Sequence, residues 1–351
     1  MDLIIKPTEL CNFACTFCSS TDLTEDKASK LSLEKIFDFL KRFPETKTII
    51  VNGGDPLMMT PDYYWKILDY LNEHKLNTTL SFTTNLWDFY KRPDKWTDLF
   101  RQKNVGVSTS FNYGETRRIS KEQVLTEEIF WEISNLFLER VGYRPDFLSV
   151  INDENEDTAL DNVRLAKRMG VECKLNYSMA SGRESRPYQL SKIYKIYLEI
   201  IHEGLVEWEF NTKEMIKGIS HQSTICPRNR KCDSGIRCLQ PDGDYYSCGA
   251  FGDDRKFAID FEKEMKSETK ITPLENEPSL AAMKPECFGC MMFSLCNGCK
   301  KTISDMKEAD MVESHCHLMK KLEAAICQLP EKFGLLKQSK YSHESRYSTV
   351  D

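Results

Sequence analysis

The sequence is poor in the features that place a protein in a membrane, outside the cell or on nucleic acid. Its 351 residues contain no apolar run near the ~20 residues that a membrane-spanning helix needs. The first residues, MDLIIKPTEL, have neither the basic start nor the long apolar segment of a secretory signal peptide. Lys and Arg number 48 against 54 Asp and Glu, so there is no excess of basic residues for phosphate binding. We therefore expect a cytoplasmic protein with no membrane and no nucleic-acid partner.

Cysteine, by contrast, is abundant. In a chain of this length without a signal peptide, 14 cysteines indicate metal or iron–sulfur ligation in a reducing cytosol rather than disulfides. Cys11, Cys15 and Cys18 form the pattern CxxxCxxC. Three thiolates on one short loop can bind three irons of a [4Fe–4S] cluster and leave the fourth iron open to a small molecule. Zinc is the alternative, but a structural zinc site needs four ligands, and this loop supplies three.

A second motif follows a buried strand predicted at residues 48–52. This strand runs directly into Gly53-Gly54-Asp55-Pro56. The two motifs together, with the aromatic Phe17 before the last cysteine of the loop, resemble the radical S-adenosylmethionine (SAM) superfamily. The resemblance implies that the backbone and carboxylate of the turn receive the amino group of SAM. Asp55 stands where the family usually has Glu, which keeps the charge but shortens the side chain.

The first ~200 residues alternate apolar runs with helical patterns, which is typical of βα units and a parallel sheet. We expect strands at 3–6, 48–52, 78–83, 105–110, 146–151 and 171–177, and helices from Ser32 and at 62–74, 95–102, 126–141, 158–169 and 190–202. Six repeats match the partial (β/α)6 TIM-like barrel of the family. In such α/β folds the chemistry lies at the C-terminal ends of strands, where both motifs fall.

Weaker signals lie at the same ends of two further strands. Relatives carry a Thr-Asn pair where this chain has Thr84-Asn85, and a serine near SAM where it has Ser108 and Ser110. The resemblance also suggests Arg117 or Arg118 as a bidentate partner of the SAM carboxylate. The alternative for each is an ordinary turn or solvent-facing residue.

The cysteine pattern changes from Cys226 on. A Pro-Asp-Gly turn at 241–243 predicts a β-hairpin that brings Cys248 back beside Cys232. This region resembles the SPASM extension of radical SAM enzymes, which carries two auxiliary [4Fe–4S] clusters. It departs from the family formula in one place, since two residues and not three separate Cys296 from Cys299. The resemblance implies one cluster on Cys226, Cys232, Cys248 and Cys299, and another on Cys287, Cys290, Cys296 and Cys316.

Two structural zinc sites are the alternative for these eight cysteines. Cys173, Cys238 and Cys327 are left over, and each is either simply buried or a hydrogen-atom donor to a substrate radical. Cys238 is the best placed for that second role. We expect a barrel domain at 1–205, then a linker helix and a small cysteine-rich SPASM domain with a β-hairpin and short helices at 206–335. Residues 336–351 are expected to be a disordered tail.

The resemblance implies a three-cluster enzyme that cleaves SAM to methionine and a 5′-deoxyadenosyl radical. That radical takes a hydrogen atom from a substrate, for which SPASM relatives mostly use peptides. A crosslink, a thioether or a related peptide maturation is therefore expected. Modification of a small natural-product precursor is the alternative. Formylglycine formation in sulfatases is disfavoured, because relatives with that activity carry an Asp base where this chain has Gly249.

Partners and competing functions also follow. A flavodoxin or ferredoxin would supply the electron. Ten residues precede Cys11, so a leader peptide would be recognised by the barrel or by a separate protein. A non-catalytic electron carrier and a zinc-ribbon interaction protein remain the alternatives from other classes. The Gly-Gly-Asp-Pro turn counts against the carrier, which has no use for a SAM site.

Overall fold

A computed structural model describes residues 1–21, 24–219, 235–271 and 300–333 of the chain. Its centre is one eight-stranded sheet with the order β6-β5-β4-β3-β2-β1-β7-β8, in which β6 and β8 form the two edges. The sheet confirms the expected parallel α/β fold, because β1 to β6 pair in parallel in chain order. The strands are Asp2–Ile5, Thr48–Val51, Thr79–Thr83, Val105–Ser110, Phe147–Ile151, Cys173–Tyr177, Ile236–Leu239 and Tyr245–Tyr246.

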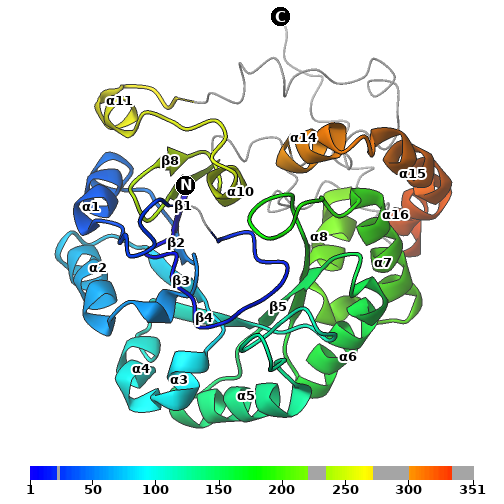
Figure 1. Cartoon of the computed structure of the whole chain (residues 1–351), viewed down its shortest axis with the longest axis horizontal. Helices are drawn as coiled ribbons and strands as arrows, with labels where there is room; N and C mark the ends of the chain where they lie inside the picture. The colour runs from blue at the N-terminus through cyan, green and yellow to red at the C-terminus, as the bar shows by residue number, and fades with distance from the viewer. Residues whose placement is uncertain (22–23, 220–234, 272–299, 334–351) are drawn as a thin grey trace, which may run out of the picture.

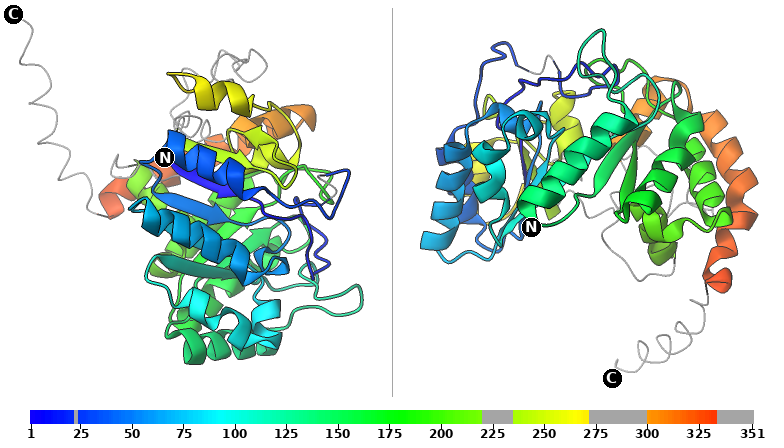
Figure 2. Two further views of the ribbon diagram at one scale, coloured as in Figure 1. Left: turned by 90° about the vertical axis from the view of Figure 1, so that its left-hand side faces the viewer. Right: turned by 90° about the horizontal axis from the view of Figure 1, so that it is seen from below.

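Helices cover one side of this sheet, so that the molecule is a curved half-barrel (Figures 1 and 2). In Figure 1 the helices α1 to α7 follow one another in an arc around the outside of the strands. They are α1 Leu33–Arg42, α2 Pro61–Glu73, α3 Trp87–Lys91, α4 Pro93–Phe100, α5 Glu127–Val141, α6 Ala159–Met169 and α7 Leu190–His202. The chain continues with α8 Phe210–Ile219, α10 Gly249–Asp253, α11 Phe261–Lys266, α14 Lys300–Glu308, α15 Val312–Cys327 and α16 Leu329–Lys332.

The sequence signals for these elements act locally, and most of them are confirmed. Ser32 caps α1 by accepting a hydrogen bond from the Glu34 amide, and Thr126 caps α5 in the same way. Gly170 ends α6 with φ +69, the left-handed conformation that glycine adopts without strain. One prediction is incomplete: the single short helix expected at 95–102 is preceded by α3, because Pro93 starts a new helix after a break at Arg92.

The two faces of the sheet differ in burial. Along β1 to β6 one set of side chains is buried against the helices, as Leu3, Ile49 and Phe82 are. The alternate side chains, such as Ser81 and Ser108, are half-exposed on the concave face. A closed TIM barrel fills its interior with side chains. This open sheet instead leaves its concave face partly accessible.

The β-hairpin after residue 235 joins this sheet rather than standing apart from it. β7 pairs in parallel with β1, with Cys238 opposite Ile4, and β8 returns antiparallel to β7. The pairing covers the edge of β1, whose backbone groups would otherwise lack partners. The expected hairpin is confirmed, while its contact with Cys232 lies outside the described residues.

A buried ion pair attaches α11 to β7. Arg237 and Glu264 of α11 are both fully buried, with Nη2 and Oε1 2.7 Å apart, and the Tyr245 hydroxyl donates to the same carboxylate at 2.5 Å. At the opposite end of the arc, α15 packs against α7. Among the described residues no helix is both long and apolar enough to cross a membrane.

Candidate functional site

The first cysteine loop follows β1 at the C-terminal edge of the sheet. Backbone hydrogen bonds hold it against the segment after β4, since the Ala14 amide donates to the Arg118 carbonyl at 2.8 Å and the Thr16 amide to that of Thr116 at 3.0 Å. Cys11 is exposed, Cys15 is buried and Cys18 is half-buried. The loop therefore presents its thiols at the open end of the half-barrel, where the sequence placed the chemistry.

The thiols do not form a site for a single ion. Nowhere in the described part of the chain do three His, Cys, Asp or Glu side chains converge on one metal-ion position. The cysteines of a [4Fe–4S] cluster bind different irons, so their sulfurs lie further apart than the ligands of one ion. The thiols of Cys15 and Cys18 both lie within electrostatic reach of the Cys11 thiol, so the loop brings the three sulfurs to one place, as a shared cluster requires.

The Gly53-Gly54-Asp55 turn packs directly against the start of the first cysteine loop. The Gly54 amide donates to the Thr8 carbonyl at 3.0 Å, and the Asp55 amide to the Leu10 carbonyl at 2.8 Å. A Cβ atom on Gly54 would lie 2.2 Å from the Glu9 carbonyl oxygen. Residue 54 must therefore be glycine for the turn and the loop to approach this closely. The tertiary structure thus joins the two motifs into one unit.

The carboxylate of Asp55 is buried and accepts hydrogen bonds from other residues of the chain. It is 1% exposed and accepts hydrogen bonds from the Leu57 amide at 2.8 Å, the Asn85 amide at 2.8 Å and the Thr84 hydroxyl at 2.9 Å. Burial raises the pKa of Asp55 to about 6, against these hydrogen bonds, which lower it. The short side chain caps the 3-10 helix Pro56–Met58. It links the turn to the Thr-Asn pair at the end of β3.

Asn85 and Ser108 occupy the ends of the next two strands. The Asn85 side-chain amide donates to Asn12 Oδ1 at 2.7 Å and lies 3.8 Å from the Cys11 sulfur. It therefore connects β3 to the cysteine loop. Ser108 donates to the Phe82 carbonyl at 3.1 Å and faces the concave side of the sheet.

Arg117 and Arg118, which the sequence left as equal candidates, lie in different surroundings. Arg117 is buried: its Nε donates to Asn112 Oδ1 at 2.9 Å, its Nη1 to Ser110 Oγ at 2.8 Å, and its guanidinium carbon lies 5.0 Å from the ring centre of Phe17. Burial lowers the pKa of Arg117, and the nearby cysteines of the loop oppose that shift. Arg118 is half-exposed and donates to backbone carbonyls of its own turn. Arg117 is therefore the arginine that lies at the loop.

Two residues of the site were missed from the sequence. The Arg183 amide donates to the Cys18 carbonyl at 2.9 Å, and its Nη1 donates to the Cys15 carbonyl at 2.8 Å. A Cβ on Gly182, which has φ +62, would lie 2.4 Å from the Cys18 carbonyl oxygen. Both lie in the loop after β6, so their position at a strand end was the available signal.

The second group of cysteines is partly outside the described residues, which leave out Cys226, Cys232, Cys287, Cys290, Cys296 and Cys299. Cys248 immediately precedes α10, and Cys316 lies in α15. Cys238 is fully buried in β7, and burial raises its pKa to about 11. Cys173 is buried at the start of β6, and Cys327 is exposed at the end of α15. That Cys238 donates a hydrogen atom to a substrate radical stays a prediction.

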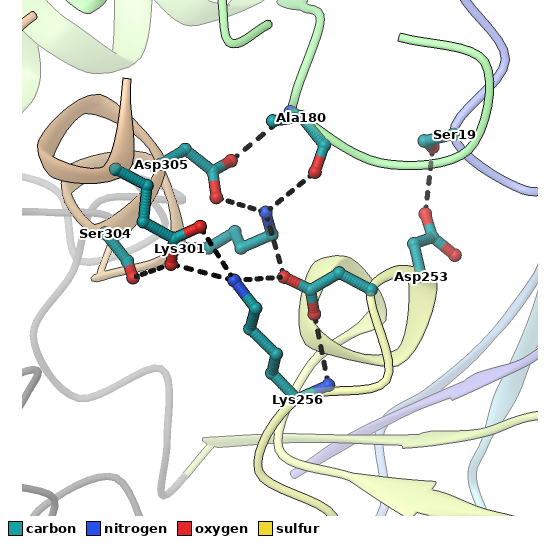
Figure 3. A network of polar contacts seen from close by, with 9 residues as sticks. Ser19, Ala180, Asp253, Lys256, Lys301, Ser304 and Asp305 are labelled. Atoms are coloured by element: carbon teal, nitrogen blue, oxygen red, sulfur yellow. Dashed lines mark hydrogen bonds and ion pairs between the residues drawn. The ribbon is translucent and has the colours of Figure 1, made fainter. Parts of the chain in front are cut away.

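A polar network joins three segments near Cys248 (Figure 3). Lys301 of α14 is buried and contacts the carboxylates of Asp254, at 3.0 Å, and Asp305. Asp305 also accepts from the Ala180 amide at 3.3 Å. The network therefore ties α10 and α14 to the loop after β6, beside the first cysteine loop.

An open parallel half-barrel with a three-cysteine loop and a glycine turn at its C-terminal edge is the architecture of a SAM-dependent radical enzyme. The model of the Radical SAM superfamily matches residues 5–183. The chain belongs to this superfamily and is an enzyme whose family binds SAM and a [4Fe–4S] cluster. Comparison with curated proteins gives no match.

Solved structures share the fold at low sequence identity. The chain is similar to native anSMEcpe with bound AdoMet (S-adenosylmethionine), at 16% identity and a TM-score of 0.72 over 95% of this chain and 99% of that one. For the same protein with bound AdoMet and the Kp18Cys peptide, the identity is 16% and the TM-score 0.72, over 94% of this chain and 99% of that one. For Streptococcus suis SuiB bound to the precursor peptide SuiA, the identity is 13% and the TM-score 0.56, over 85% of this chain and 71% of that one. These likenesses show the fold.

Proposed function

We propose that the enzyme reductively cleaves SAM and uses the 5′-deoxyadenosyl radical to take a hydrogen atom from a peptide, which is then oxidatively modified. The observation that carries this proposal is the close packing of the cysteine loop on the Gly53-Gly54-Asp55 turn, with buried Arg117 beside it. An electron carrier has no use for such a turn or for an arginine held at the cluster loop.

Each residue of the site has a role in this proposal. Cys11, Cys15 and Cys18 would hold a cluster that supplies one electron and an open iron when bound. The guanidinium of Arg117 keeps donors beyond its two protein partners and suits the carboxylate of SAM. Because the Asp55 carboxylate already accepts hydrogen bonds from Leu57, Thr84 and Asn85, we assign the amino group of SAM to the backbone of the turn. Asn85 and Ser108 would border SAM at the strand ends.

A peptide substrate is supported by two observations. The concave face is half-exposed and carries polar side chains at the strand ends, which are suitable hydrogen-bonding partners for an extended chain. Two of the similar structures are described as peptide complexes. Gly249 has no carboxylate, so we do not assign formylglycine formation.

We further propose two auxiliary [4Fe–4S] clusters, on the two sets of four cysteines given above. Lys301 follows Cys299 closely in the chain, and its partner Asp254 follows Cys248. The ion pair between them supports the assignment of Cys248 and Cys299 to one cluster. A flavodoxin or ferredoxin would supply electrons, and a separate protein could present the peptide's leader segment.

Iron analysis and SAM cleavage test this function together. Protein purified and reconstituted without oxygen should hold about twelve irons, as three four-iron clusters, and about four fewer after Cys11, Cys15 and Cys18 are changed to Ala. The reduced protein should form 5′-deoxyadenosine from SAM. Zinc with little iron, or intact clusters that form no 5′-deoxyadenosine, would exclude the proposal.

The two neighbouring arginines provide a matched test of SAM binding. Arg117→Lys should weaken SAM binding at least about tenfold, because a lysine cannot replace the planar fork of a guanidinium. Arg118→Lys should leave binding unchanged, since that side chain contacts only carbonyls of its own turn among the described residues. Equal affinities in equilibrium dialysis would remove Arg117 from the SAM site.

A further inference from the structure

A buried ion pair lies where β1 ends, beside the first cysteine loop. Lys6 is 2% exposed, and its ammonium group contacts the carboxylate of Asp253, the last residue of α10. Removing two charges from water is unfavourable, and apolar residues often serve stability as well. Unlike the Arg237–Glu264 pair, which attaches α11 to β7, this pair lies at the cysteine loop, so its charges can act on a group that the loop binds.

Two serines attach this ion pair to the cysteine loop. Ser19 and Ser20 directly follow Cys18, the last cysteine of the motif. The Ser19 hydroxyl donates to Asp253 Oδ2 at 2.9 Å, and the Ser20 hydroxyl lies 3.3 Å from both Asp253 Oδ1 and Lys6 Nζ. Asp253 thus fixes the turn that leaves the loop.

The same turn acts on the sulfur of Cys18. The Ser20 amide donates a hydrogen bond to the Cys18 sulfur, and the positive charges of Arg183 and Lys6 lie close enough to act on the same atom. A hydrogen bond donor and a buried cation therefore both favour negative charge on this sulfur. A Cβ atom on Gly249, at the start of α10, would lie 4.0 Å from Lys6 Cε, so the Lys6 stem passes beside the segment that follows Cys248.

We propose that the Lys6–Asp253 pair sets the reduction potential of the cluster held by Cys11, Cys15 and Cys18. The inference rests on the proposed function, because it requires a cluster on these cysteines. Reduction adds one negative charge to a cluster, and hydrogen bonds to its sulfurs and nearby charges are known to move its potential. Lys6 supplies the charge that favours the reduced state, and Asp253 moderates it while holding the Ser19-Ser20 turn.

The two ends of the pair should shift the potential in opposite directions. Lys6→Met removes a positive charge, so the potential falls. Asp253→Asn leaves the lysine charge uncompensated, so the potential rises. The double variant removes both charges and returns toward the wild-type value. A pair with a purely structural role would give changes of the same sign, because either substitution would loosen the same turn.

The chain offers a matched control in the adjacent carboxylate. Asp254 is the next residue, but it contacts Lys301 on α14, whereas Asp253 contacts Ser19 of the cysteine loop (Figure 3). Asp254→Asn therefore makes the same chemical change on the other side of the network, and the potential should stay at the wild-type value. Lys6→Arg retains the charge and should also keep the potential.

The experiment is a redox titration of the reconstituted protein followed by electron paramagnetic resonance. The signal of interest is the one that disappears when Cys11, Cys15 and Cys18 are changed to Ala, and the iron content of each variant verifies its loading. We expect each single variant to change the reduction equilibrium at least tenfold, which is about 59 mV for a one-electron couple.

The outcomes separate the two proposals. The role of the pair would be overturned if the potential shifted in the same direction in Lys6→Met and Asp253→Asn. It would also be overturned if Asp253→Asn and Asp254→Asn both kept the wild-type potential. Either result would leave the proposed function intact. If Lys6→Met does not load iron, the rise in potential expected for Asp253→Asn tests the role of the pair by itself. If the triple cysteine variant loses no signal, no cluster is bound there, and the proposed function fails as well.

Discussion

Gly54→Ala tests whether the contact between the turn and the cysteine loop builds the site. A Cβ atom at residue 54 would lie 2.2 Å from the Glu9 carbonyl oxygen and 2.3 Å from that of Leu10. Both atoms belong to the backbone, so no side chain can rotate away. To reach the 3.0 Å below which real Cβ contacts essentially never fall, the loop must retreat by 3.0 − 2.2 = 0.8 Å.

The size of the effect follows from these contacts. Overpacking of this kind costs about 1–3 kcal/mol. The retreat also stretches two backbone hydrogen bonds, from the Gly54 amide to Thr8 and from the Asp55 amide to Leu10, each with a net value of about 1 kcal/mol. We expect the unfolding free energy to fall by about 3–5 kcal/mol and the loop carrying Cys11 to bind iron less completely.

Gly106→Ala is the matched control. It is the same substitution in β4, where an added Cβ would meet nothing within 4 Å. Urea unfolding of the apo proteins and iron content after reconstitution give the two readouts. If Gly54→Ala unfolds at the same urea concentration as Gly106→Ala and loads the same amount of iron, the packing argument is wrong.

Two further predictions concern buried charges. Burial raises the pKa of Asp55 to about 6 from its usual 3.8, so the native state binds more protons than the unfolded state between about pH 4 and 6. The unfolding free energy should therefore fall by about 3 kcal/mol as the pH rises through this window, and Asp55→Asn should lack that contribution in urea titrations at pH 4.5 and 7. A difference between the two proteins that stays constant with pH would contradict this. Glu264→Gln should lower the unfolding free energy by about 3–5 kcal/mol, because it leaves the charge of Arg237 buried without a counter-ion. Glu262→Gln, at an exposed position on the same helix, should change it by less than about 0.5 kcal/mol, and equal losses would argue against the buried pair.

The sequence predicted the barrel well because its signals are local. Apolar runs, the Ser32 and Thr126 caps and the Gly170 stop each act within a few residues, and the structure places strands and helices near the expected bounds. The two motifs were found for the same reason: CxxxCxxC and Gly-Gly-Asp-Pro are short and continuous. Their position after strands was enough to assign them to one edge of a parallel sheet.

The partners of individual side chains could not be predicted in this way. The resemblance implied that the backbone and carboxylate of the turn receive SAM, and it gave no sign that the Asp55 carboxylate also accepts hydrogen bonds from Leu57, Thr84 and Asn85, the last two just beyond β3. Arg117 and Arg118 differ by one position, and packing of the segment after β4 buries one of them and leaves the other half-exposed.

By itself, then, the sequence determined the class of fold, the cysteine loop and the glycine turn, because each depends on neighbouring residues. The tertiary structure alone decided that β7 extends the sheet at β1, that Gly182 and Arg183 support the loop, and that Lys6 meets Asp253. These contacts join segments up to 247 residues apart. No periodicity or motif records them, since they depend on how the packed helices and strands bring distant side chains together.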